Sequence, residues 1–179
     1  MPEYDENFQL SPIFANSVIT ITKSGAFHQV LTYDYSEPTG QYFKLVQLDD
    51  EFYEKEIENL SINMQNYMDS CVNKINDAYV KPEVIETEID FKEEVFPFYY
   101  WVITFKGELK EGINVYESTI EKDTLEYNIS SIYILEKPLI PISVESTLNY
   151  DILKEQRIVK YWAETNDSVG PTEILRFKL

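Results

Sequence analysis

The sequence is poor in the residues that most often build catalytic and metal centres. Its 179 residues include one cysteine, one histidine and five glycines. The lone Cys71 cannot form an intrachain disulfide, and with the single His28 it cannot form a thiolate-rich zinc site. The glycines are isolated, so the sequence has no G-x-G-x-x-G turn, no P-loop and no G-x-S-x-G turn. We therefore predict no catalytic residue, no metal site and no cofactor, and the sequence favours a protein that is not an enzyme.

Positive charge is also scarce. The chain has 15 Lys and Arg against 32 Asp and Glu, a formal net charge of −17. Such a polyanion repels phosphate backbones and anionic headgroups. Only Arg157 and Arg176 offer the planar fork that suits bidentate phosphate contacts, and the lysines form no basic run. We expect neither a nucleic acid nor a membrane as partner.

Long apolar runs are absent. The longest, residues 96–105, contains Pro97 and Thr104 and is about half as long as a membrane-spanning helix. The first residues, Met1 to Glu6, include acidic side chains where a signal peptide has basic ones. The sequence thus predicts a cytoplasmic protein.

What the chain does contain is a hydrophobic core. Hydrophobic residues make up 44% and aromatic residues 15% of it, enough for one compact domain over residues 1–179. A division at Pro82 is the alternative, with three strands and a long helix in 1–81 and an antiparallel sheet in 82–179. Residues 81–83 are too short to act as a free linker, which favours the single domain.

The strongest local pattern predicts a helix over residues 49–78. The segment has no glycine or proline before Pro82, and Asp49 or Asp50 can cap its first amides. An apolar stripe recurs at helical spacing, at Tyr53, Ile57, Leu60, Met64, Tyr67, Cys71 and Ile75.

The remaining pattern is that of strands. After an irregular start through about Asn16, alternating segments predict strands at 17–22, 27–35, 41–48, 84–91, 99–105, 113–118, 125–135, 140–146, 156–164 and 173–179. These elements predict an α+β fold, a mainly antiparallel sheet of about nine strands packed on or curled around the one long helix.

Three carboxylates stand out on one strand. Glu86, Glu88 and Asp90 alternate with apolar residues and therefore share one face, where they could bind a hard cation or work as an acid–base pair. A solvated sheet face is the simpler interpretation. Cys71 and His28 could likewise form a nucleophile and base, but Cys71 lies on the apolar stripe, where cysteine usually acts as a small hydrophobic residue.

Aromatic side chains are the other candidates for a site. The predicted strand at 99–105 begins with aromatic residues that point to both faces, so either both faces are covered or one face meets something else. The candidate ligand or interface residues are Tyr67, Met68, Tyr99, Tyr100, Trp101 and Tyr127.

These observations lead to two functional hypotheses. The first is a non-enzymatic protein–protein interaction module with an acidic surface, in the form of a homodimer or with a basic protein partner. The alternative is a small-molecule carrier or enzyme with an apolar cavity between helix and sheet. The two differ in whether Tyr67, Met68, Trp101 and Tyr127 point into a cavity or into a filled core.

Overall fold

A computed structural model describes residues 8–179 of the chain. The expectation of a signal-free N-terminus, which rests on Met1 to Glu6, lies outside these residues. The described part is mostly β-strand with two helices, an α+β architecture. Its strands form a seven-stranded, a five-stranded and a two-stranded sheet rather than one sheet of about nine strands curled around a helix.

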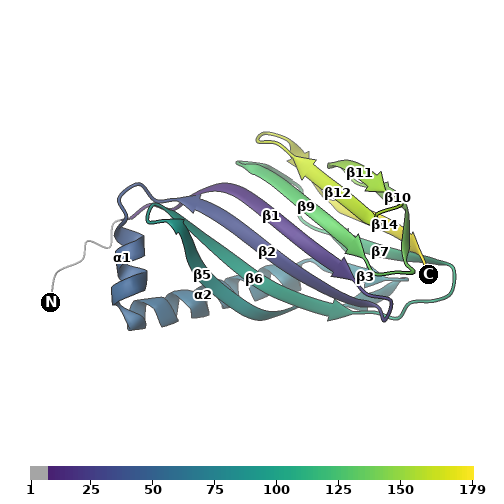
Figure 1. Cartoon of the computed structure of the whole chain (residues 1–179), viewed down its shortest axis with the longest axis horizontal. Coiled ribbons are helices and arrows are strands. Elements are labelled where there is room, and N and C mark those ends of the chain that lie inside the picture. Colours follow the sequence, from purple (N-terminus) through teal and green to yellow (C-terminus); the bar gives the residue numbers. More distant parts are fainter. Residues whose placement is uncertain (1–7) are drawn as a thin grey trace.

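The seven-stranded sheet is the largest of the three sheets (Figure 1). Its strand order is β11-β12-β9-β1-β2-β6-β5. Neighbouring strands are antiparallel except β1 and β9, which run parallel. Their bounds are β1 Ser11–Ile21, β2 Ala26–Ser36, β5 Glu83–Glu93, β6 Phe96–Lys106, β9 Asn128–Leu135, β11 Asn149–Leu153 and β12 Ile158–Ala163.

The large sheet has one inner face, because side chains alternate along each strand. On β1, Ala15, Ser17, Ile19 and Ile21 are buried while the residues between them are partly exposed. The registers continue this face across the neighbouring strands. The opposite, outer face carries the residues that alternate with them.

Two helices cover one end of the inner face. α1 (Gln41–Leu48) follows a turn, and α2 (Asp50–Ser70) runs on from it at an angle, along the side of β5 (Figure 1). The carboxylate of Asp49 accepts a hydrogen bond from the Phe52 amide at 3.0 Å and caps α2. Gln65 ties α2 to the sheet, since its amide oxygen accepts from the Val84 amide at 2.8 Å.

The five-stranded sheet covers the other end of that face. Its order is β10-β14-β7-β3-β4, and every neighbouring pair is antiparallel. The strands are β3 Val72–Ile75, β4 Ala78–Val80, β7 Ile113–Thr119, β10 Ile140–Glu145 and β14 Thr172–Lys178. The short strands β8 (Asp123–Thr124) and β13 (Ser168–Val169) pair with each other.

The core accordingly has two parts. The sheet-on-sheet core lies between the two large sheets and includes the fully buried Ile21, Phe27, Leu175 and Phe177. The helix-on-sheet core lies under α1 and α2, and its buried members are Tyr42, Met68, Ile89, Tyr99, Trp101 and Ile103. Leu60 and Met64 of the predicted stripe pack against it from α2.

The backbones of Gly25 and Gly107 approach each other closely at the sheet-on-sheet end. Gly25, in the turn between β1 and β2, has φ +81°, and a Cβ built on it would lie 2.0 Å from the carbonyl oxygen of Gly107. The Gly107 amide donates to the Gly25 carbonyl at 3.0 Å. A side chain at position 25 therefore conflicts with both the dihedral angle and the contact.

Three sequence predictions were wrong. Residues 41–48 form α1 and not a strand, because Tyr42 and Leu45 bury one face of a helix at a spacing of three residues. A segment of eight residues is too short for its apolar pattern to distinguish a helix from a strand. The helix ends at Ser70 and not at 78, since Cys71 is extended and 72–75 pair with β7. The irregular start to Asn16 is instead largely β1, which begins at Ser11.

Candidate functional site

A cleft lies where the two cores meet on the inner face of the large sheet. It consists of three hollows with volumes of about 240, 740 and 180 Å³. Ile120 and Ile129 line all three, and Tyr33 and Tyr67 line the first two. Because the hollows share these walls they adjoin one another, and we call them together the cleft, with a central, a wide and a side chamber.

Small side chains make the floor of the central chamber. Ala15, Ser17 and Ser131 face inward from β1 and β9, and Ser17 lies directly opposite Ser131 in the parallel register. Large side chains occupy the inward positions further along, at Ile19 and Tyr133. The missing side-chain volume at three adjoining positions leaves a space that the sheet cannot close by itself.

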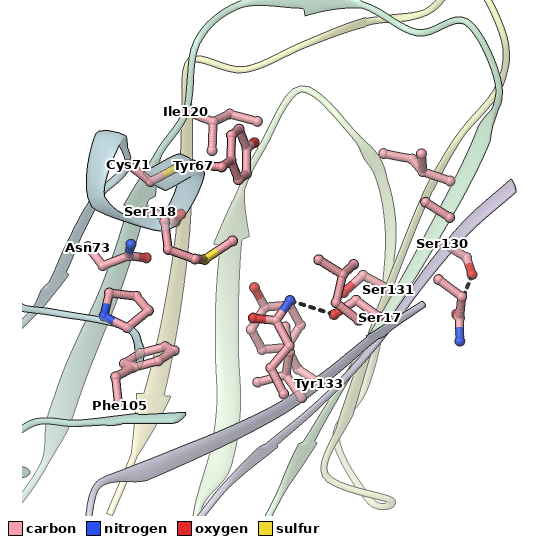
Figure 2. A pocket seen from close by; sticks show the side chains of 18 of the residues that line it. Ser17, Tyr67, Cys71, Asn73, Phe105, Ser118, Ile120, Ser130, Ser131 and Tyr133 are labelled. Carbon is pink, nitrogen blue, oxygen red and sulfur yellow. Dashed lines mark hydrogen bonds between the residues drawn. The ribbon is translucent and has the colours of Figure 1, made fainter. Parts of the chain in front are cut away.

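The opposite wall comes from α2 and the five-stranded sheet. Met68 and Cys71, at the end of α2, and Ser118 of β7 face the central chamber. Figure 2 shows Tyr67 and Ile120 at one end of it, with Ser17, Ser131 and Tyr133 across from Cys71 and Ser118. The side-chain amide of Gln29 donates to Ser17 Oγ at 2.9 Å, so this polar pair is already hydrogen-bonded.

The wide chamber is aromatic. The rings of Tyr33 and Trp101 meet edge to face with centroids 5.7 Å apart, and those of Tyr33 and Tyr127 at 5.9 Å. The indole nitrogen of Trp101 donates to the Leu60 carbonyl of α2 at 3.3 Å, which fixes the ring. The exposed residues Glu121 to Asp123 form the rim.

The side chamber contains a carboxyl group. Glu173 of β14 is half-buried there, and the hydroxyl of Tyr133 donates to its Oε1 at 2.9 Å. Burial raises the pKa of Glu173 to about 7, although the bond from Tyr133 acts in the opposite direction. Burial and the nearby Glu173 also raise the pKa of Tyr133 well above its usual value.

The cleft brings together four of the predicted site residues. Tyr67 and Met68 line the central chamber, and Tyr67, Trp101 and Tyr127 line the wide one. Tyr99 is buried in the helix-on-sheet core, with its ring 6.1 Å from Trp101, and lines none of the three chambers. Tyr100 points to the outer face of the sheet, between two inward-facing neighbours.

The three predicted carboxylates lie on β5, away from the cleft. Glu86 and Asp90 are exposed, and Glu88 is half-buried where the hydroxyl of Tyr53 on α2 donates to it. Ile85 is the first of the apolar residues that alternate with these carboxylates, and it is 57% exposed because a bulge shifts the register between Val84 and Glu86. Within residues 8–179 no three metal-ligating side chains come together.

Cys71 and His28 do not form a pair. Cys71 lines the cleft on the inner side of the large sheet, and His28 is exposed on the outer face of β2. Burial raises the pKa of the Cys71 thiol, which favours the unreactive protonated form.

Sequence reasoning missed the polar residues of the cleft, Ser17, Gln29, Ser131 and Glu173. The available signal was a small or polar side chain at an inward position of an otherwise apolar strand face. In β9, Ser131 stands between Ile129 and Tyr133, and in β14 Glu173 shares a face with Leu175 and Phe177.

No protein-family model and no curated protein matches the chain. Among solved structures, the folded domain of the Mycobacterium tuberculosis protein LppM is 10% identical at a TM-score of 0.47, over 97% of this chain and 95% of that one. A candidate protease from Parabacteroides distasonis is 6% identical at a TM-score of 0.39, over 95% of this chain, which spans only 40% of that protein. Neither likeness is close enough to support a conclusion about this chain.

No helix in the part of the chain that the structure describes has the length and apolar character needed to cross a membrane.

Proposed function

We propose that the chain binds an amphipathic small molecule in the cleft. The observation that carries this proposal is the grouping of three chambers around Ile120 and Ile129, which line all of them. Ligand sites are concave, mostly apolar and supplied with a few converging polar groups, and their usual volume is about 300 to 1,000 Å³. Tyr33, Trp101 and Tyr127 supply apolar surface in the wide chamber, and Ser17 and Glu173 supply polar groups in the other two.

The position of the cleft supports a carrier. The large sheet is a rigid floor, and α2 covers it with side chains that are mostly half-buried, with Met68 its only buried residue. Tyr67 is 47% exposed at the edge of the cover. A ligand could therefore enter beside α2 without separating the two large sheets.

Two tryptophans allow a direct test. Trp101 lines the wide chamber, whereas Trp162 is on the outer face of β12. We expect the neutral dye N-phenyl-1-naphthylamine to bind saturably and, in the Trp162→Phe variant, to receive fluorescence energy transfer from Trp101. In the Trp101→Phe variant, which keeps only Trp162, the energy transfer to the dye should be much weaker. Equal transfer from both, or no saturable binding, would contradict the proposal.

A blocking substitution tests the central chamber. Ser17→Leu adds bulk at the floor, and we expect dye affinity to fall by roughly tenfold through overlap with the bound molecule. Thr20→Leu places the same side chain on the outer face of β1 and should leave affinity unchanged. Urea unfolding of both variants separates loss of the site from loss of the fold.

A second candidate, self-association, is favoured by the outer face of the large sheet. Ile132, Val18, Val30 and Val102 lie in one row across β9, β1, β2 and β6. The row ends in Lys160 on one side and Glu86 on the other. Val30 is 43% exposed, so this apolar row faces solvent in the single chain.

This order of charges suits a second copy of the chain. In a face-to-face pair with its two-fold axis parallel to β1 and β2, Val18 meets the partner's Val30 and Lys160 meets the partner's Glu86. The apolar rows then cover each other.

Sedimentation velocity tests whether two copies of the chain form this dimer. We expect a dimer that Val30→Glu dissociates, whereas Ile113→Glu, at an exposed apolar position of β7, leaves it intact. Lys160→Glu should weaken the dimer and the added Glu86→Lys should restore it. A wild-type monomer at about 100 µM would overturn the proposal, since interfaces of about 1,200 Å² or more hold at that concentration.

A further inference from the structure

The side chamber contains a carboxylate without a cationic partner. The ion pairs among residues 8–179 use Glu136, Glu117, Asp69, Asp34 and Glu145. Glu173 is in none of them. The nearest cation along β14, Arg176, points to the other face and pairs with Glu145 at 2.5 Å. A half-buried carboxylate that lacks a cation is costly when ionised.

The hydrogen bonds of Glu173 are also incomplete. An ionised carboxylate offers about four acceptor sites. The one side-chain donor among the described residues is the Tyr133 hydroxyl, at 2.9 Å. Ser118, the register partner of Glu173 on β7, and Ser146, Thr147 and Thr172 contribute further hydroxyls to the chamber wall. Hydroxyl groups, which can accept as well as donate, therefore surround Glu173, and no Lys, Arg or His is among the described residues that line the chamber.

From this geometry we infer that the cleft takes a cationic amphiphile, a molecule with a protonated amine at one end, and that Glu173 binds the ammonium group. This inference rests on the proposed ligand-binding function and names its ligand class.

The chemistry of the ammonium group fits the chamber. A primary ammonium has three donors and no acceptor. One donor can bond Glu173, and the others can bond hydroxyl oxygens of the wall. A ligand carboxylate at the same place would meet Glu173 with like charge and would be excluded.

The rest of the molecule agrees with this choice. The side chamber adjoins the central one, with which it shares Tyr133, Ser118, Ile120 and Ile129, so an apolar chain attached to the amine has the rest of the cleft next to it. The net charge of −17 raises the local concentration of cations and lowers that of anions. Both effects favour an amine over a fatty acid.

Three ligands of equal chain length test the inference. Dodecylamine, dodecanol and dodecanoate are each used to displace N-phenyl-1-naphthylamine from the full chain at pH 7. We expect dodecylamine to bind roughly tenfold or more tightly than dodecanol, and dodecanoate to bind most weakly, since charge-assisted hydrogen bonds are the stronger ones.

A matched pair of variants assigns the effect to one residue. Glu173→Gln keeps the shape and removes the charge, and we expect it to reduce the amine preference to within about threefold while dodecanol affinity is kept. Glu155→Gln removes the same charge from an exposed turn between β11 and β12 and should keep the preference.

The outcomes separate the two proposals. If no dodecyl compound displaces the dye, the ligand-binding function itself fails. If dodecanol or dodecanoate binds as tightly as dodecylamine, the cleft is a site but the amine class is wrong. If Glu155→Gln lowers the amine preference as much as Glu173→Gln does, general charge and not Glu173 is responsible. The three-ligand comparison on the wild type decides the amine class even if Glu173→Gln does not fold.

Discussion

The two ends of the large sheet are covered in different ways. At the sheet-on-sheet end, Ile21, Phe27, Leu175 and Phe177 are fully buried. At the helix-on-sheet end, α2 contributes Met68 as its only buried residue, and the other apolar residues of its stripe are half-buried. One end is a packed core, and the other is a sheet face with a shallow helical cover.

This difference explains where the cleft lies. Two packed sheets can interdigitate over a wide area, whereas a single helix covers a strip about 10 Å wide. The inner face of the seven-stranded sheet is wider than that strip. The uncovered area between α2 and the five-stranded sheet carries Ala15, Ser17 and Ser131, whose small side chains leave it open.

The largest expected effect tests the packed end. Phe177→Ala removes a fully buried ring between the two sheets, and we expect a loss of about 3 to 5 kcal/mol in the free energy of unfolding. Urea denaturation measures it. A loss below about 1 kcal/mol would show that this end is packed more loosely than the helical cover.

The next effect concerns the carboxyl group between the two ends. The pKa of Glu173 in the fold is about 7, above its usual value of 4.5. Its contribution to stability is therefore fully present below about pH 4.5 and is lost as the pH rises through 7. Glu173→Gln should be more stable than the wild type by about 2 to 3 kcal/mol at pH 8.

At pH 4 this difference between Glu173→Gln and the wild type should nearly vanish. The titratable groups that face Glu173 are Tyr116, Tyr133 and Tyr161, which stay neutral across this range, so the transition belongs to Glu173. Urea unfolding between pH 4 and pH 8 measures it, with Glu155→Gln as the control for net charge. A constant difference across this range would contradict the burial of the carboxyl group.

A smaller effect is expected at the helical cover. Leu60→Ala shortens a half-buried side chain of α2 over Trp101, and we expect a loss of about 2 kcal/mol. The comparison with Phe177→Ala, measured under the same conditions, is the result of interest. Equal losses would mean that the helix packs as deeply as the second sheet does.

The smallest effect concerns a buried hydroxyl. Tyr161 is 1% exposed, and its hydroxyl has no hydrogen-bond partner among the described residues. Tyr161→Phe removes a polar group that the fold leaves unsatisfied, so we expect unchanged or slightly higher stability, by about 0.5 kcal/mol. A loss above about 1 kcal/mol, measured by thermal unfolding, would show that this hydroxyl makes a stabilising hydrogen bond in the folded protein.

Local structure was largely predictable from the sequence. The stripe from Tyr53 to Tyr67 predicted α2, Asp49 was one of its two expected caps, and the alternation of residues 17–22 and 27–35 predicted the central part of β1 and β2. These features depend on contacts within a few residues. The boundary near Cys71 was missed because Cys71 and Ile75 continue the four-residue spacing of the stripe, whereas the residue that shares the buried face of β3 with Ile75 is the polar Asn73.

The candidate site was only partly predictable for the same reason. Aromatic residues such as Trp101 and Tyr127 could be proposed from their type, but Ser17 and Ser131 are ordinary residues until β1 and β9 are paired. Their register joins residues more than a hundred positions apart, through a parallel pairing inside an otherwise antiparallel sheet. No local pattern encodes that choice.

The sequence by itself determined most of the strands, the long helix and the strongly acidic charge, because each follows from neighbouring residues or from composition. The tertiary structure alone decided that three small side chains lie side by side, that α2 covers only part of the inner face, and that Glu173 faces the resulting space. These depend on which distant strands pair, and pairing is selected by burial over the whole chain rather than by any single segment.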